Sequence, residues 1–462
     1  MEAPSAPSTC PCHLVAMPYP ARGHINPLMN FCKLLLSNNT GILVTFVVTE
    51  EWLALIASDP KPDNIELRSI PNVVPSELTR ANNHLGFLEA VMTKMEAPFE
   101  ELLRCLQPPP TAIVADTFLY WAVVVGIRRN IPVASFWTMS ASMFSVLYHH
   151  HLLDQNGHYP VNLSENGEKR VDYIPGISTM RLADFPLNDG SCRSTQTMQL
   201  SLKGFKWVSR AQYLLLASIY ELEPEAIDVL KEELPFPVYT IGPAIPSFSL
   251  QNTPTLSNNN GTSHGYMEWL DAQPAGSVLF ISQGSHFSVS RAQIDEIASA
   301  LRESGIRFLW VARGEASRLK QICGNNGLVV TWCDQLRVLC HPCIGGFWSH
   351  CGWNSTKEGV LAGVPFLTFP IIMDQPLDSK MIVEDWKVGW RMKEDVDVSI
   401  LVEKDEIVML LQKFMDLDTE LARGIRERSK TLQRICLRAI TNGGSAVTHL
   451  DAFRRDLMQI TN

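Results

Sequence analysis

The stretch that decides the fold runs from Trp332 to Gln375 and reads WCDQLRVLCHPCIGGFWSHCGWNSTKEGVLAGVPFLTFPIIMDQ. Its apolar run Ile344 to Trp348 predicts a short buried strand, and Ser355 to Ala362 predicts a helix. The polar residues between the two fall at the helix start, where backbone N–H groups and the positive end of the helix dipole attract anions. The stretch therefore predicts an α/β fold with an anion site at this turn.

The turn itself has two readings. Gly352 has no Cβ, so a ligand can approach the backbone closely there, and His350 ends the strand beside it. However, Ser355 to Glu358 reads STKE, which matches a capping box without any ligand. An ordinary helix cap thus remains an alternative explanation.

Polar and aromatic residues flank this turn on both sides. Trp332 ends an apolar strand over 327–331, where its indole could stack on a planar base or serve as a core aromatic. Glu358 lies one helical turn beyond Asn354 and could accept both hydroxyls of a ribose. Asp374 and Gln375 follow a strand predicted over 365–369, at the sheet edge where open α/β folds bind ligands. The order suggests a base, a phosphate and a sugar.

The whole stretch resembles the signature box of the plant secondary-product glycosyltransferases, which are UDP-sugar-dependent enzymes with the two-domain GT-B fold. The resemblance spans the box without a gap, and it implies donor-binding roles along it. Trp332 would stack on uracil, and the backbone of Cys333 would bond to the edge of the base. The ribose would be held by Gln335 and Glu358. The diphosphate would be held by His350, Gly352, Asn354 and Ser355, and the sugar by Trp353, Asp374 and Gln375. Asp334 replaces the usual Pro and Phe369 the usual Trp, while Gln375 is similar to glucose users rather than galactose users.

Transfer of a sugar to a hydroxyl needs a base, and histidine titrates near neutral pH. His24 follows a strand predicted over 13–19 and opens a helix predicted over 25–37. Asp116 ends the strand predicted over 111–115, so it should reach the same edge and orient the imidazole. A buried structural histidine and a simple aspartate N-cap are the alternatives for these two residues taken singly.

The resemblance adds roles in the first half of the chain. His24 falls in a PxxGHxxP segment and Asp116 in IVADTF, as the catalytic dyad of the family requires. Thr138 matches a position that touches the donor sugar, Ser285 one that touches the phosphate, and Phe118 a wall of the acceptor pocket. We therefore expect an inverting displacement that converts UDP-glucose and a small lipophilic plant metabolite (flavonoid, phenolic, terpenoid or hormone) into a β-glucoside and UDP.

The chain is long enough for two large cores, with 462 residues of which 46% are hydrophobic. Short apolar strands alternate with helical stretches, which predicts parallel, doubly wound sheets. We expect an N-terminal Rossmann-like domain over 1–246, a polar linker over 247–265 and a C-terminal Rossmann-like domain over 266–445. The two should face each other across a cleft, with a last helix over 446–462 packing back on the first domain, as the resemblance implies.

Composition argues against several classes of partner. The net charge is −9 with no basic stripe, so neither nucleic acid nor an anionic membrane is expected. We see no signal peptide and no membrane-spanning run, which favours a cytoplasmic protein, and we expect a monomer. The 11 cysteines are scattered, as in reduced proteins.

No cofactor is expected beyond UDP-glucose as co-substrate. Asp395-Val396-Asp397 spells the DxD motif of metal-dependent glycosyltransferases, but its acidic connector reads as a solvated turn. The triplet His149 to His151 reads as an exposed helix end rather than a metal site. Two other functions stay open: a serine/histidine hydrolase using Ser285, although GxSxG is absent there, and a UDP-sugar sensor without turnover.

Overall fold

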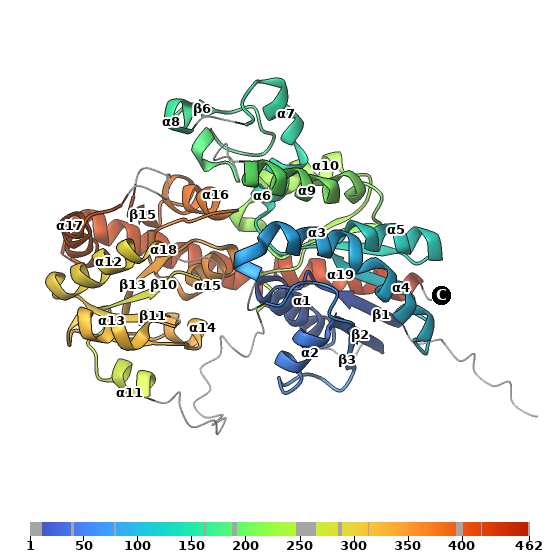
Figure 1. The fold of residues 1–462 in the computed structure, drawn as a ribbon, viewed down its shortest axis with the longest axis horizontal. Helices are drawn as coiled ribbons and strands as arrows, with labels where there is room; N and C mark the ends of the chain where they lie inside the picture. The colour runs from blue at the N-terminus through green and yellow to red at the C-terminus, as the bar shows by residue number, and fades with distance from the viewer. Residues whose placement is uncertain are drawn as a thin grey trace, which may run out of the picture. The chain divides into compact units, whose positions relative to one another are not determined.

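The computed structural model describes residues 12–37, 41–77, 80–160, 163–186, 192–245, 265–284, 289–312, 314–393, 401–416 and 418–460. The chain divides into two compact units (Figure 1). Unit 1 comprises Met1–His149, Cys192–Pro246 and Ala439–Asn462, and unit 2 comprises His150–Ser191 and Ser247–Arg438. Each unit has its own sheet and its own core.

The sheet of unit 1 has seven strands in the order β3-β2-β1-β4-β5-β8-β9, and every neighbouring pair is parallel. Their bounds are β1 Cys12–Met17, β2 Ile42–Thr49, β3 Ile65–Ile70, β4 Ala112–Asp116, β5 Val133–Trp137, β8 Tyr213–Leu216 and β9 Val238–Thr240. Both faces of the central strands are buried, so they read as nearly unbroken apolar runs rather than as alternating ones.

Helices cover both faces of this sheet. They are α1 Arg22–Leu35, α2 Glu50–Ile56, α3 His84–Lys94, α4 Glu96–Cys105, α5 Tyr120–Arg129, α6 Ala141–Tyr148, α9 Cys192–Val208, α10 Pro224–Glu233 and α19 Ser445–Ile460. The sequence predicts one helix over 87–106, but the structure has two, α3 and α4. The physical reason is Pro98, whose ring would clash with the carbonyl of Lys94 and which has no N–H to donate.

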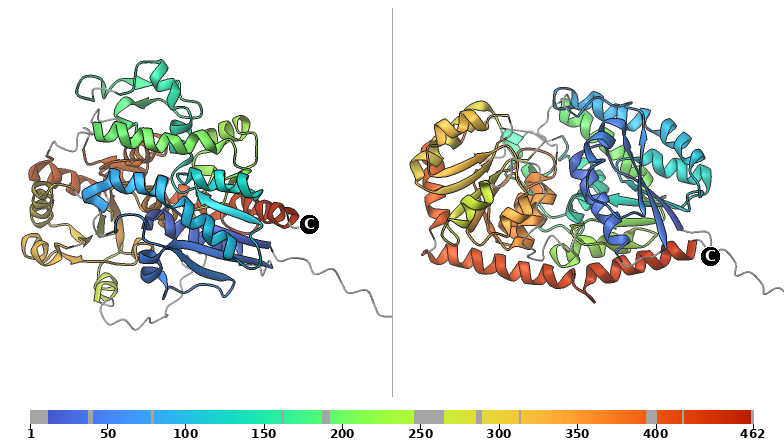
Figure 2. Two further views of the ribbon diagram at one scale, coloured as in Figure 1. Left: turned by 45° about the vertical axis from the view of Figure 1, so that its right-hand side comes forward. Right: turned by 90° about the horizontal axis from the view of Figure 1, so that it is seen from below.

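The last helix, α19, completes the core of unit 1. Phe453 is fully buried and its ring packs against Phe31, Tyr213 and Tyr239. The hydroxyl of Tyr239 donates a hydrogen bond to Asp456 across 2.7 Å. Figure 2 shows α19, in red, alongside the elements of unit 1.

The sheet of unit 2 has six parallel strands in the order β12-β11-β10-β13-β14-β15. Their bounds are β10 Val278–Ser282, β11 Arg307–Val311, β12 Gly327–Val330, β13 Ile344–Ser349, β14 Phe366–Thr368 and β15 Gly389–Arg391. The helices are α11 Gly265–Asp271, α12 Arg291–Ser304, α13 Ala316–Cys323, α14 Gln335–Leu339, α15 Trp353–Ala362, α16 Gln375–Lys380, a π-helix Met381–Asp385, α17 Lys404–Met415 and α18 Glu420–Ala439. Both units therefore have the Rossmann-like strand order that the sequence pattern predicts.

Residues 150–191 belong to a different unit from the one that the sequence predicts for them. Residues 150–191 group with unit 2, although they were placed in the N-terminal domain. The segment contains α7 His150–Gln155, α8 Leu163–Asn166, β6 Arg170–Val171 and β7 Met180–Arg181. Its polar side chains bond to the region of the π-helix, including an ion pair of 3.0 Å between Arg170 and Glu384. Composition alone does not show a pairing across more than two hundred positions.

The histidine triplet is not an exposed helix end. His149 and His150 are buried, and only His151 is exposed. Nε2 of His149 lies 2.7 Å from a carboxylate oxygen of Glu233, because α6 packs against α10. Residues 247–264 of the predicted linker and Asp395-Val396-Asp397 lie outside the described residues. No helix among the described residues has the length and apolarity needed to cross a bilayer.

Candidate active site

In unit 1, the candidate site lies where the strand order reverses between β1 and β4. His24 is in the first turn of α1, which follows β1, and Asp116 is the last residue of β4. The two strands are direct neighbours in the sheet. The carboxyl ends of parallel strands at such a reversal form the usual ligand crevice of doubly wound folds.

The structure brings His24, Asp116 and Thr138 together. Nδ1 of His24 lies 2.7 Å from Oδ2 of Asp116 and 3.1 Å from Oγ1 of Thr138. An ionised carboxylate can only accept, so Nδ1 carries the ring proton and Nε2 keeps its lone pair. Among the described residues, no hydrogen bond to Nε2 is formed, and 19% of the side chain is exposed. A partly exposed imidazole in this tautomer is equipped to take a proton.

The carboxylate of Asp116 is itself held in place. Its Oδ1 accepts a hydrogen bond of 3.1 Å from the backbone N–H of Phe118, and the side chain is buried. Rings surround the imidazole: the centroid of Tyr19 lies 5.0 Å from it and that of Phe118 lies 6.2 Å from it. Phe118 thus stands beside the base, where the resemblance places a wall of the acceptor pocket.

In unit 2, the corresponding reversal falls between β10 and β13. The strand β13 ends at Ser349, and α15 begins at Trp353 with Gly352 as its N-cap. The capping-box explanation is wrong, because the helix begins too early for Ser355 to be its N-cap. Asn354 and Ser355 are the second and third residues of the helix. Gly352 supplies no side chain to cap the first-turn N–H groups.

His350 lies half-buried beside this helix start, and two glycines make room for its ring. A Cβ added to Gly352 or to Gly284 would lie 2.7 Å from Nε2 of His350. The sequence suggests that Gly352 lets a ligand approach; in the structure its missing Cβ first admits this imidazole. Burial lowers the pKa of His350 to about 4, with the backbone carbonyl of Ser282 opposing. His350 is therefore neutral at physiological pH and can act as a hydrogen-bond donor but not as a cation.

Two residues with unusual backbone angles flank the predicted donor contacts. Cys351 has φ of +67° immediately before Gly352, and Met373 has φ of +65° immediately before Asp374. Side chains larger than hydrogen make this conformation costly, so it persists mainly where the surroundings enforce it, often at functional sites. Both turns carry residues predicted to hold the diphosphate and the sugar.

The predicted ribose ligands contact each other. Nε2 of Gln335 donates to a carboxylate oxygen of Glu358 at 2.8 Å and to Oγ of Ser355 at 2.9 Å. Burial raises the pKa of Glu358 to about 7, with the hydrogen bond from Gln335 opposing and the charge of Asp334 adding to the rise. The carboxylate consequently changes its ionisation in the physiological range.

The indole of Trp332 is 58% exposed, which excludes the core-aromatic reading of this residue. The next turn is held by Asp334, whose backbone N–H donates to the hydroxyl of Tyr266 at 3.2 Å. The carboxylate of Asp334 caps α14 by accepting from the N–H of Arg337. The usual proline has no N–H and could not form this hydrogen bond. Asp334 therefore adds a contact with Tyr266 of α11 that the common family pattern would lack. Neither Tyr266 nor Gly284 was predicted as part of the site, because each contacts a site residue that is distant along the chain.

The two predicted sugar ligands mark the start of α16. Asp374 is its N-cap and Gln375 its first residue, and both are mostly buried. The amide oxygen of Gln375 accepts from the N–H groups of Ile371 and Ile372 at 2.8 and 3.1 Å, which fixes the orientation of the amide. The ring of Trp353 is buried and lies 6.3 Å from that of Trp386, so any donor contact would come from its main chain. Buried Cys333 likewise offers its backbone.

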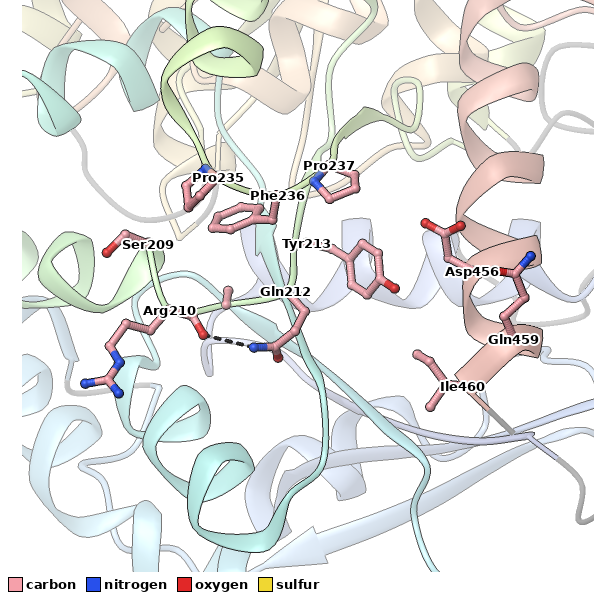
Figure 3. Close-up of a pocket in the computed structure, with 11 residues that line it drawn as sticks. Ser209, Arg210, Gln212, Tyr213, Pro235, Phe236, Pro237, Asp456, Gln459 and Ile460 are labelled. Atoms are coloured by element: carbon pink, nitrogen blue, oxygen red, sulfur yellow. Dashed lines mark hydrogen bonds between the residues drawn. The ribbon is translucent and has the colours of Figure 1, made fainter. Parts of the chain in front are cut away.

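Ser285 lies outside the described residues. Within the described ranges, no group of three or more His, Cys, Asp or Glu residues is arranged to hold a metal ion. A pocket of about 700 Å³ in unit 1 is lined by the residues drawn in Figure 3, including Tyr213 and Asp456. It lies at the amino ends of β8 and β9, whereas His24 lies at the carboxyl ends of the strands. The pocket therefore takes no part in the candidate site.

Known proteins match this chain along nearly its whole length. Residues 246–403 match the family model described as UDP-glucoronosyl and UDP-glucosyl transferase. UDP-glycosyltransferase 87A1 of Arabidopsis thaliana is 50% identical over 446 residues, covering 96% of this chain and 100% of the relative. The chain belongs to the plant UDP-glycosyltransferases. It is therefore a transferase whose donor is a UDP-sugar.

Solved structures of other UDP-glycosyltransferases share its fold. The Medicago truncatula enzyme UGT71G1, complexed with UDP-glucose, is 26% identical with a TM-score of 0.82, over 97% of this chain and 98% of that one. The Phytolacca americana enzyme UGT2, complexed with UDP-2-fluoro-glucose and pterostilbene, is 27% identical with a TM-score of 0.78, over 96% and 99%. The predicted GT-B class with two Rossmann-like domains is confirmed.

Proposed function

We propose that this UDP-glycosyltransferase transfers glucose from UDP-glucose to a hydroxyl group of a small lipophilic plant metabolite, with inversion at the anomeric carbon. His24 takes the proton of the acceptor hydroxyl on Nε2 as the oxygen forms its bond to the anomeric carbon. The bond from that carbon to the diphosphate breaks on the opposite face, and UDP leaves. The products are a β-glucoside and UDP.

The contact of 2.7 Å between His24 and Asp116 carries this proposal. The carboxylate selects the tautomer that leaves Nε2 basic and stabilises the imidazolium that forms during transfer. The start of α15 and the neutral imidazole of His350 would receive the charge that develops on the diphosphate. The chemistry thus needs no metal in this proposal, and chelation should leave the rate unchanged.

The acceptor class rests on the side chains beside the base. Tyr19 and Phe118 present aromatic surface next to His24, which suits a flavonoid, another phenolic, a terpenoid or a hormone. Binding of pterostilbene by the Phytolacca americana relative agrees with a phenolic hydroxyl as nucleophile. We propose glucose as the sugar because Gln375, the last residue of the signature box, is similar to that of glucose users. We also propose that the enzyme acts as a monomer in the cytoplasm.

The decisive experiment compares His24→Ala with wild type, measuring UDP release from UDP-glucose with and without a panel of phenols and terpenoid alcohols. We expect turnover to fall by ~10²-fold or more while UDP affinity stays nearly unchanged. His341→Ala is a matched control, because His341 also pairs with an aspartate, Asp271 at 3.0 Å, and has a similarly buried side chain. This control should retain full turnover.

The same assay separates the alternatives. Release of UDP without any acceptor would point to a hydrolase, and binding of UDP-glucose without release would point to a sensor. Among the described residues, which do not include Ser285, no structural observation favours either alternative. Undiminished turnover by His24→Ala would reassign the base.

A further inference from the structure

A single helical run links the predicted sugar ligands to the segment that unit 2 takes from the first half of the chain. The run begins at Gln375, passes through α16 and continues without a break into the π-helix Met381–Asp385. Lys380 lies about 7.5 Å from Gln375 along the axis, at ~1.5 Å per residue. π-helical turns are rare and concentrate at functional sites. Two side chains anchor the far end of this run.

The first anchor is Lys380, whose side chain is only 1% exposed. Its Nζ donates to both carboxylate oxygens of Asp385, at 2.9 and 3.0 Å, and to the hydroxyl of Ser178. Ser178 in turn donates to Asp385 at 2.8 Å. A buried ammonium is stable only with such partners, so the position of Lys380 depends on residue 178.

The second anchor is Glu384, in the same π-helix. Its carboxylate accepts from Arg170 at 3.0 and 3.4 Å and from Arg391 at 2.8 Å. Arg391 also lies 3.8 Å from Asp184, which forms a buried pair with Arg181. Residues 168–184, which we call the anchoring segment, thus contact both acidic residues of the π-helix.

The other end of the run has little freedom to move independently. Ser379 donates to Thr368 at the end of β14 across 2.9 Å, which fixes the middle of the run to the sheet. The amide oxygen of Gln375 is engaged by the N–H groups of Ile371 and Ile372. Because Lys380 and Gln375 lie on one continuous, tightly packed helical run, strain at Lys380 is carried through that run toward Gln375.

We propose that the anchoring segment positions Asp374 and Gln375 against the donor sugar, acting through Lys380 and Glu384. Arg170, Ser178 and Lys380 are then positioning residues that determine affinity for the hexose and leave the uridine contacts unaffected. The inference rests on the proposed sugar-binding role of Asp374 and Gln375. It differs from simple stabilisation of unit 2, which would alter binding of the uridine and the sugar alike.

The test is calorimetric titration of UDP-glucose and of UDP, without acceptor, into full-length wild type and variants. Arg170→Gln should raise the Kd ratio of UDP-glucose to UDP about three- to fivefold, as expected for an exposed ion pair, and Arg170→Lys should restore most of it. Lys380→Met should raise the ratio tenfold or more. Arg104→Gln, which breaks a more exposed pair with Glu101 in unit 1, should change neither Kd.

Arg170 is 50% exposed, so its substitution tests the inference even if Lys380→Met does not fold. An unchanged ratio in Arg170→Gln, or an equal loss of affinity for both ligands, overturns the inference while leaving the proposed function intact. Failure of wild type to bind or transfer glucose from UDP-glucose overturns the proposed function, and the inference with it.

Discussion

The amide of Gln335 and the carboxylate of Glu358 form a hydrogen bond of 2.8 Å that joins α14 to α15. The same amide also donates to Ser355, so one side chain connects the predicted ribose site to the predicted phosphate site. Binding of the nucleoside should therefore respond to the ionisation of Glu358.

Uridine affinity should rise with pH. Burial places the pKa of Glu358 at about 7, so the group is mainly protonated at pH 6 and mainly ionised at pH 8. Only the ionised form offers both carboxylate oxygens as acceptors to the two ribose hydroxyls, so affinity should increase about tenfold over that range. Uridine is the probe because it has no phosphate that titrates in this window. Calorimetry should show weak, pH-independent binding by Glu358→Gln; a flat wild-type profile would refute the assignment.

Removing the indole of Trp332 should weaken UDP binding by ~1–3 kcal/mol, because an exposed ring that stacks on a base contributes about that much. Trp332→Phe keeps a π-face and should retain most of the affinity. Met409→Ala, another exposed apolar residue of unit 2, serves as the control and should bind UDP normally. Unchanged titration of UDP by Trp332→Ala would remove the stacking role.

Gly352→Ala should selectively impair diphosphate binding. The new Cβ would lie 2.7 Å from Nε2 of the half-buried His350 and would displace its ring. Loss of a hydrogen bond to a charged group costs ~1.5–3 kcal/mol, so UDP affinity should fall by tenfold or more while uridine affinity changes little. Gly265→Ala, where a Cβ meets nothing within 4 Å, is the control. Equal weakening of UDP and uridine would instead indicate general damage to unit 2.

Phe453→Ala should destabilise unit 1 by ~3–5 kcal/mol, because its fully buried ring packs between the sheet and α1. Met458→Ala, on the more exposed side of the same helix, should change stability by less than ~0.5 kcal/mol. Denaturant unfolding measures both. If the two variants unfold alike, α19 does not contribute to this core.

Local patterns predicted most of the secondary structure. The strand that ends at Asp116 and the helix that contains His24 follow from apolar runs, and the order of strands and helices predicted parallel sheets. The shared carboxyl edge of parallel strands predicted the pairing of His24 with Asp116, which are 92 positions apart, and the resemblance implied the same pair.

Other features depend on contacts that no local pattern reveals. The anchoring segment belongs to unit 2 because Arg170 reaches Glu384, and the sequence around Arg170 resembles any polar loop. The burial of His149 follows from packing of α6 on α10. Gly284 was overlooked because its need for a small side chain comes from His350, which follows β13 and is distant along the chain.

The three-part composition of unit 1 has a consequence for biosynthesis. Its core includes Phe453 and Leu457, which are translated only after the whole of unit 2. Nascent chains grow at ~5–20 residues per second, so the first Rossmann-like unit would wait for tens of seconds with one helix missing. During translation, unit 2 has all of its segments before unit 1 does, and chaperones would be most needed by the half that is made first.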